Sequence, residues 1–130
     1  MKVKIFILFL FFLALTIYLG NFYRPFIYLN NIDDYGLADV GYNIIAVTNM
    51  SLLSWTGFYK FTKNKIFDIA INTLVFLSYE ILSYFFSIFG VFDIKDFIAL
   101  IFSSLLSLGL LFFIDKKSYL MYKEEIQFYL

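Results

Sequence analysis

The sequence predicts an all-α integral membrane protein, a bundle of four transmembrane helices in one domain that covers residues 1–130. Three observations lead to this prediction. The chain is 62% hydrophobic and 24% aromatic, whereas soluble domains are about 45–50% apolar. Only 15% of its residues are charged, which is too few to cover the surface of a soluble domain. Four apolar stretches approach the roughly 20 residues that cross a bilayer.

The four apolar stretches define the expected elements in chain order. The transmembrane helices are expected at residues 5–23, 40–59, 66–89 and 97–114. Their connections contain three glycines and the only proline, namely Gly20, Gly36, Gly90 and Pro25. We expect the first helix to remain uncleaved, because no small-x-small cleavage site follows its apolar run. The tail at residues 115–130 mixes aromatic and charged residues and is expected to lie in the membrane interface.

The basic residues are distributed unevenly among these connections. With the N-terminus in the cytoplasm, eight of the ten lie inside: Lys2, Lys4, Lys60, Lys63, Lys65, Lys116, Lys117 and Lys123. Five acidic residues lie outside, in the two outer loops or at the adjacent helix ends: Asp33, Asp34, Asp39, Asp93 and Asp96. Because positive charge is retained in the cytoplasm, both termini are expected there (N-in/C-in). The sequence thus predicts a multi-pass protein of the bacterial cytoplasmic (inner) membrane.

The two halves of the chain are similar enough to be interpreted as two repeated helical hairpins. In the second hairpin a polar and three small residues share one helix face: Asp96, Ala99, Ser103 and Ser107. Asp39 and Asn43 begin a comparable face in the first hairpin. Small residues at this spacing pack membrane helices together, and Asp is a common N-cap. A shared polar cleft that opens outward is the alternative interpretation of the same residues.

Glu80 is the one acidic residue expected in the interior of a span. It lies about 21 Å along the third helix from Ile66, in the outer half of the hydrocarbon. A carboxylate is costly there, and its default interpretation is a functional site with a partner. The expected partners are Arg24, or Asn43 and the hydroxyl groups of the second helix. A structural role, as a hydrogen-bonding group between helices, is equally open.

Several kinds of chemistry are missing from the sequence. The chain has no histidine and no cysteine, which removes the commonest general base and all thiolate chemistry. Phosphate-binding glycine loops, metal-ligand clusters and nucleophile elbows do not occur in it. We therefore expect no catalytic residue, no metal, no cofactor and no nucleic-acid partner. The expected partners are the lipid bilayer and either a second copy or another membrane protein.

Four positions in the C-terminal half follow a family pattern, namely Glu80, Asp93, Asp96 and Ala99. This order resembles the C-terminal signature of the VanZ-like family, small multi-span bacterial membrane proteins named for a member linked to teicoplanin resistance. The chain departs from that signature at other positions. The signature has an Arg in the turn directly before the position of Phe92, and this chain has none there. Leu100 replaces the usual Asn, and Ser103 and Ser107 replace glycines. The family's upstream Lys and His motif is also missing. The resemblance implies a role at the cell envelope and no established reaction.

Three functions follow from these observations. The first is a VanZ-like membrane protein of the cell envelope, not an enzyme, with an outward polar cleft formed by Glu80, Asp93, Asp96, Asp39, Asn43 and Arg24. The second is a small proton-coupled multidrug-type transporter. Four helices and one membrane carboxylate resemble that class, although its glutamate lies in the first helix, where this chain has no acid. The third is an accessory or assembly subunit whose polar faces bind the helices of a partner.

Overall fold

The structure is a computed structural model that describes residues 1–58, 62–117, 120 and 127. All regular elements in this part of the chain are helices. Three helical stretches there are long and apolar enough to cross a membrane: Lys2–Leu29, α5 (Lys65–Phe85) and α6 (Ile94–Ile114). The chain is therefore all-helical and compatible with a multi-pass membrane protein, and it has fewer long apolar helices than the four predicted.

The first helix is longer than the predicted residues 5–23. It is built from α1 (Lys2–Tyr18), the π-helical turn η1 (Leu19–Tyr23) and α2 (Arg24–Leu29), so Gly20 and Pro25 do not lie in a connection. Pro25 is in the first turn of α2. A proline has no N–H to donate and its ring displaces the preceding turn. The wider π-helical turn accommodates this distortion without ending the helix.

The second predicted helix, at residues 40–59, is shorter in the structure. The α-helix α4 (Asn43–Thr56) has 14 residues, and Gly41 and Tyr42 separate it from the single turn α3 (Leu37–Val40). Gly57 ends α4 in the left-handed conformation, with a φ of 96°. Glycine adopts this conformation without a steric penalty and is the usual residue at this position. The chain therefore leaves the helix before residue 59.

The third and fourth predicted helices are found with shifted ends. The helix α5 begins at Lys65, where the side chain of Asn64 accepts a hydrogen bond from the Ile66 N–H at 2.9 Å. It ends at Phe85, and the 3₁₀ turn η2 (Ser87–Phe89) follows. The helix α6 begins at Ile94, three residues earlier than predicted, because Asp93 caps its first turn. The predicted end at Ile114 agrees with the structure.

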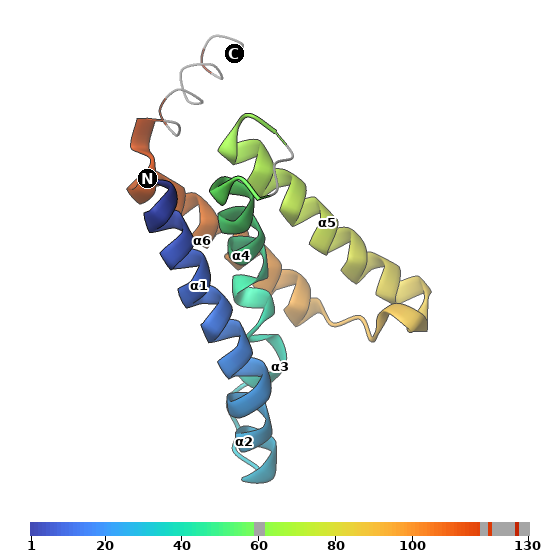
Figure 1. Cartoon of the computed structure of the whole chain (residues 1–130). Coiled ribbons are helices and arrows are strands. Elements are labelled where there is room, and N and C mark those ends of the chain that lie inside the picture. Colours follow the sequence, from blue (N-terminus) through green and yellow to red (C-terminus); the bar gives the residue numbers. More distant parts are fainter. Residues whose placement is uncertain (59–61, 118–119, 121–126, 128–130) are drawn as a thin grey trace.

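The helix α4 lies in the centre of the bundle (Figure 1) and packs against α1, α5 and α6. In Figure 1 the chain runs along α1 to α2, returns through α4, leaves again along α5 and comes back along α6. The apolar core contains residues of all four helices: Ile5, Val47, Leu52, Trp55, Ile69, Leu100 and Leu111. The shortest of the four helices is thus the one that holds the others together.

The outer surfaces of the longer helices are apolar. Phe11 of α1 is 61% exposed, Leu105 of α6 is 61% exposed and Phe113 of α6 is 85% exposed. Contiguous apolar surface of this extent is rare on soluble monomers and suits contact with lipid. Most of the predicted interfacial tail, including Tyr119, Tyr122 and Tyr129, lies outside the described residues. At its beginning Asp115 pairs with Lys65 of α5.

The two ends of the bundle differ in charge. The N-terminus of α1, the end of α4 and the start of α5 meet at one end (Figure 1), which we call the lysine-rich end, with Lys2, Lys63, Lys65, Lys116 and Lys117. At the opposite end α2, α3 and the start of α6 contact each other. We call this the acid-rich end, with Asp33, Asp34, Asp39, Asp93 and Asp96. The described part of the chain therefore separates most of its basic residues from most of its acidic ones.

Candidate functional site

The face of α6 that carries Ala99, Ser103 and Ser107 is buried against α4. Thr48 of α4 donates a hydrogen bond from Oγ1 to the Ser103 carbonyl oxygen at 3.1 Å, and its Oγ1 lies 3.0 Å from Ser107 Oγ. Ser107 Oγ donates to the Ser103 carbonyl oxygen at 2.8 Å. Small side chains let the two backbones approach closely, and the hydroxyl groups hydrogen-bond across the contact. Ser103 and Ser107 therefore pack the two helices together and line no polar cleft, while Ala99 borders an apolar groove.

The other sides of α4 also carry buried polar groups. Asn49 Nδ2 donates to Thr16 Oγ1 of α1 at 2.7 Å. Asn72 Nδ2 of α5 donates to Ser51 Oγ at 3.4 Å. Thus α4 forms a side-chain hydrogen bond to each neighbouring helix. Asn43 is a site residue predicted from the sequence, whereas Thr48, Asn49 and Ser51 are not, although a polar side chain in a membrane segment is expected to face other protein groups.

Asn43 and Asp96 meet at the acid-rich end of the α4–α6 contact. The Asn43 Nδ2 group donates a hydrogen bond to Asp96 Oδ1 at 2.7 Å, and Asn43 is only 6% exposed. Asp93 lies one turn earlier and accepts a hydrogen bond from the Lys95 N–H at 2.9 Å, as the cap of α6. Both aspartates are therefore held in defined positions, Asp93 by its own helix and Asp96 by α4.

Glu80 lies on α5 and is half-buried. Its backbone carbonyl accepts a hydrogen bond from Ser83 Oγ at 2.6 Å. Its carboxyl group has no hydrogen bond or ion pair with another described residue, and the charged groups that act on it electrostatically are Asp96 and Asp93. We call these three residues, Glu80, Asp93 and Asp96, the carboxylate cluster. Like charges repel each other, and a bound proton or organic cation would relieve the repulsion.

Arg24 does not pair with Glu80. Its guanidinium forms an ion pair with Asp39 at 3.6 Å and lies over the ring of Tyr28, 5.6 Å from the centroid. The Tyr28 hydroxyl also donates to Asp39. Both charged side chains are more than 40% exposed, so the pair contributes at most about 1 kcal/mol. The residues expected to line one polar cleft thus form two groups, one around Arg24 and Asp39 and one around Asp96.

The aspartates of the first loop hold its backbone. Asp33 Oδ1 accepts a hydrogen bond from the Tyr35 N–H at 3.0 Å. Asp34 accepts from the Gly36 N–H at 3.1 Å and from the Ala38 N–H at 2.7 Å, which caps α3. These bonds give Asp33 and Asp34 a structural role. In the described part of the chain, no group of three or more acidic residues has a geometry that could hold a metal ion.

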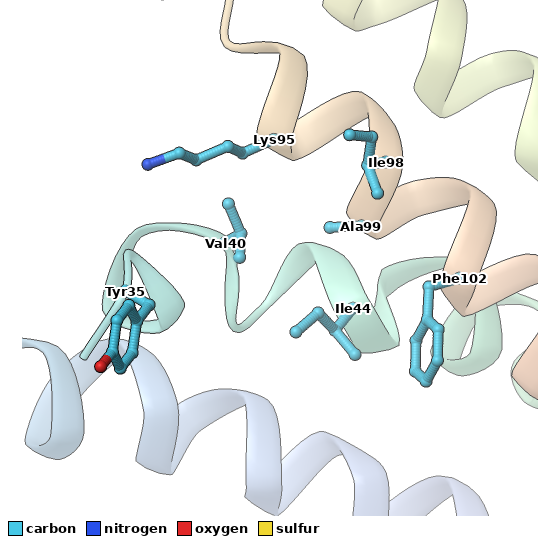
Figure 2. A pocket seen from close by; sticks show the side chains of 7 residues that line it. All are labelled: Tyr35, Val40, Ile44, Lys95, Ile98, Ala99 and Phe102. Atoms are coloured by element: carbon cyan, nitrogen blue, oxygen red, sulfur yellow. The ribbon is translucent and has the colours of Figure 1, made fainter.

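An apolar groove of about 420 Å³ lies between the α3–α4 segment and α6. Figure 2 shows Lys95 and Tyr35 near one end of the groove and Ile44 and Phe102 at the other. Lys95 is the only charged residue in its lining. The groove therefore offers apolar contact and one cation, and none of the carboxylate cluster lines it.

The elements and contacts above define an all-helical protein with three membrane-length helices and a carboxylate cluster at one end. A comparison with protein-family models, curated proteins and solved structures finds no match for the chain. The resemblance to the VanZ-like family stays a prediction from the sequence pattern.

Proposed function

We propose that the chain is a four-pass membrane protein of the VanZ-like type, which acts at the bacterial cell envelope through the carboxylate cluster. One observation carries this proposal. Glu80 of α5 has only carboxylates as charged neighbours, Asp93 and Asp96 of α6, in helices long and apolar enough to cross a membrane. An acidic residue in a membrane helix marks a functional site by default. A cationic group of the ligand, such as an amine, is the chemical partner that this cluster favours.

The direction of the chain supports four passes. The first long helix ends at the acid-rich end and α5 begins at the lysine-rich end, so residues 37–56 have to return the chain across the bundle (Figure 1). At 1.5 Å per residue the 14 residues of α4 span about 21 Å, and the turn α3 before it extends the segment toward the roughly 30 Å of the hydrocarbon core. Three of its polar side chains, Thr48, Asn49 and Ser51, hydrogen-bond to the three surrounding helices, so α4 needs less apolar surface than the other helices to cross.

The charge difference between the two ends supports the orientation. Lysines retained on the cytoplasmic side place the lysine-rich end, with both termini, in the cytoplasm of the bacterial cell. The acid-rich end then faces the outside, where envelope ligands are found. The carboxylate cluster is thereby on the side that the proposed role requires.

Deletion of the gene is expected to change the susceptibility of the cells to glycopeptides or other agents directed at the cell wall. Complementation with the Glu80→Gln or Asp96→Asn variant should fail to restore the wild-type susceptibility, because each removes a charge from the cluster. Asp33→Asn is the matched control, since Asp33 is an exposed loop residue outside the cluster. Unchanged susceptibility of the deletion strain across a panel of such agents would contradict the envelope role.

A proton-coupled transporter is the second candidate, and the absence of a bonded partner for the Glu80 carboxyl among the described residues favours it. In this case Glu80→Gln is expected to abolish proton-driven efflux of cationic drugs from proteoliposomes, because the amide cannot carry the proton. The Asp33→Asn variant should retain efflux. Equal efflux by the wild type and Glu80→Gln, in proteoliposomes that contain the same amount of folded protein, would rule out proton coupling through this residue.

A further inference from the structure

The lysine-rich end contains a partly open cavity of about 210 Å³ that the proposed function does not use. It lies where the start of α1, the end of α4 and the start of α5 meet (Figure 1). Its polar and charged lining includes Lys2, Ser54, Trp55, Lys63, Lys65 and Asp68. The cavity is at the opposite end of the bundle from the carboxylate cluster, so a ligand there acts independently of that site.

Two buried polar groups of this lining have no hydrogen-bond partner among the residues that the structure describes. Ser54 is fully buried and Trp55 is 5% exposed, yet neither Ser54 Oγ nor Trp55 Nε1 forms a hydrogen bond. An unsatisfied buried polar group costs about 1–3 kcal/mol, and native proteins rarely leave one unpaired. The indole N–H can only donate. The missing partner of Trp55 is therefore a hydrogen-bond acceptor.

The charges around the cavity favour an anion. Lys2 and Lys63 form no ion pair with another described residue, while Lys65 is paired with Asp115. The one carboxylate of the lining, Asp68, accepts two hydrogen bonds from Thr62 at 3.0 Å each, from its N–H and from its hydroxyl. The N-terminus of α5 borders the cavity and adds a partial positive charge. The lining thus combines two unpaired lysines and two unpaired buried groups with one carboxylate, whose Oδ1 is already bonded to Thr62.

We propose that this cavity binds a phosphate group, carried by inorganic phosphate or by the headgroup of an anionic phospholipid in the adjacent leaflet. A phosphate offers several acceptor oxygens, enough for Trp55 Nε1, Ser54 Oγ and a lysine together. A phosphate, unlike water, also brings negative charge to Lys2 and Lys63. The cavity is also several times larger than the space of one water molecule, about 30 Å³.

Trp55 is the only tryptophan of the chain, so its fluorescence reports on the cavity without labelling. The purified full-length protein in detergent is titrated with inorganic phosphate, and with chloride at the same ionic strength. We expect a saturable change in Trp55 emission with phosphate alone. The Lys63→Ala and Ser54→Ala variants should each weaken the apparent affinity at least severalfold. Lys117→Ala, an exposed lysine of the same end that does not line the cavity, should leave it unchanged.

Nanodiscs distinguish the two sources of the phosphate group. A change in emission on transfer from phosphatidylcholine to phosphatidic acid nanodiscs, reduced by Lys63→Ala, assigns the site to a lipid headgroup. A response to inorganic phosphate in phosphatidylcholine nanodiscs assigns it to the free ion. The proposal is overturned if folded protein, verified by circular dichroism, responds to neither probe. It is equally overturned if phosphate acts no differently from chloride, or if Lys117→Ala weakens binding as much as Lys63→Ala does.

Discussion

The substitution Ser103→Leu is expected to lower the free energy of unfolding by about 1–3 kcal/mol or more. Ser103 is fully buried, and its hydroxyl and carbonyl groups both contact Thr48 of α4. A leucine has no room there, so it has to push α6 away from α4 or adopt a strained rotamer. Either response also breaks the hydrogen bonds between Thr48, Ser103 and Ser107. Thermal unfolding of the purified variant in detergent, followed by circular dichroism, measures the loss.

The neighbouring serine provides the control for this experiment. Ser104 is on the same helix turn but only half-buried, so Ser104→Leu adds the same side chain where it can face lipid. The Ser104→Leu variant is expected to unfold at nearly the wild-type temperature. If both variants, or neither, lose stability, the close contact of α4 with α6 through Ser103 is not what holds the bundle together.

The substitution Asn43→Leu is the second change with a large expected effect. It removes the side-chain donor that lies 2.7 Å from Asp96 Oδ1 and leaves this carboxylate beside an apolar group. Hydrogen bonds to charged groups contribute about 1.5–3 kcal/mol, and solvent reaches the half-buried Asp96 carboxylate only in part. We expect a loss of stability of this size, measured by the same unfolding transition.

A double-mutant cycle tests whether the loss comes from the broken pair. The Asn43→Leu and Asp96→Leu double variant removes both polar groups, and replacing a buried polar pair by apolar groups is often nearly neutral. We therefore expect the double variant to be more stable than Asn43→Leu alone. Additive losses from the two single substitutions would show that Asn43 and Asp96 are not coupled.

The apolar pattern of the sequence identifies the helices because lipid-facing side chains dominate it. The stretches expected at residues 66–89 and 97–114 correspond to α5 and α6, whose exposed faces are apolar. The ends of the helices depend on local backbone conformation and on capping side chains, which a hydropathy pattern does not describe. Gly57 ends α4 through its left-handed conformation, and Asp93 starts α6 as a cap. At Pro25 the rule that proline breaks helices is wrong, because a π-helical turn absorbs the distortion.

The sequence predicts fewer features of the candidate site than of the helices. The periodicity of α6 places Asp96, Ala99, Ser103 and Ser107 on one face, and the structure has all four toward α4. The partner of each charge depends on the relative positions of helices, which a single sequence does not encode locally. Arg24 thus contacts Asp39, nearby in the chain, and Asn43 contacts Asp96, 53 residues away. The unpaired groups of Ser54 and Trp55 have no signal in the sequence, because burial and partners both depend on packing.

The proposed four-pass arrangement depends on α4 crossing the membrane, and cysteine labelling tests this most directly. The chain has no native cysteine, so Tyr35→Cys and Phe58→Cys each introduce a single thiol, at positions 92% and 78% exposed on either side of α4. A membrane-impermeant maleimide is applied to intact and to permeabilised cells. Four passes with both termini in the cytoplasm predict that Tyr35→Cys reacts in intact cells and that Phe58→Cys reacts only after permeabilisation. Labelling of both positions from the same side would contradict the crossing of α4.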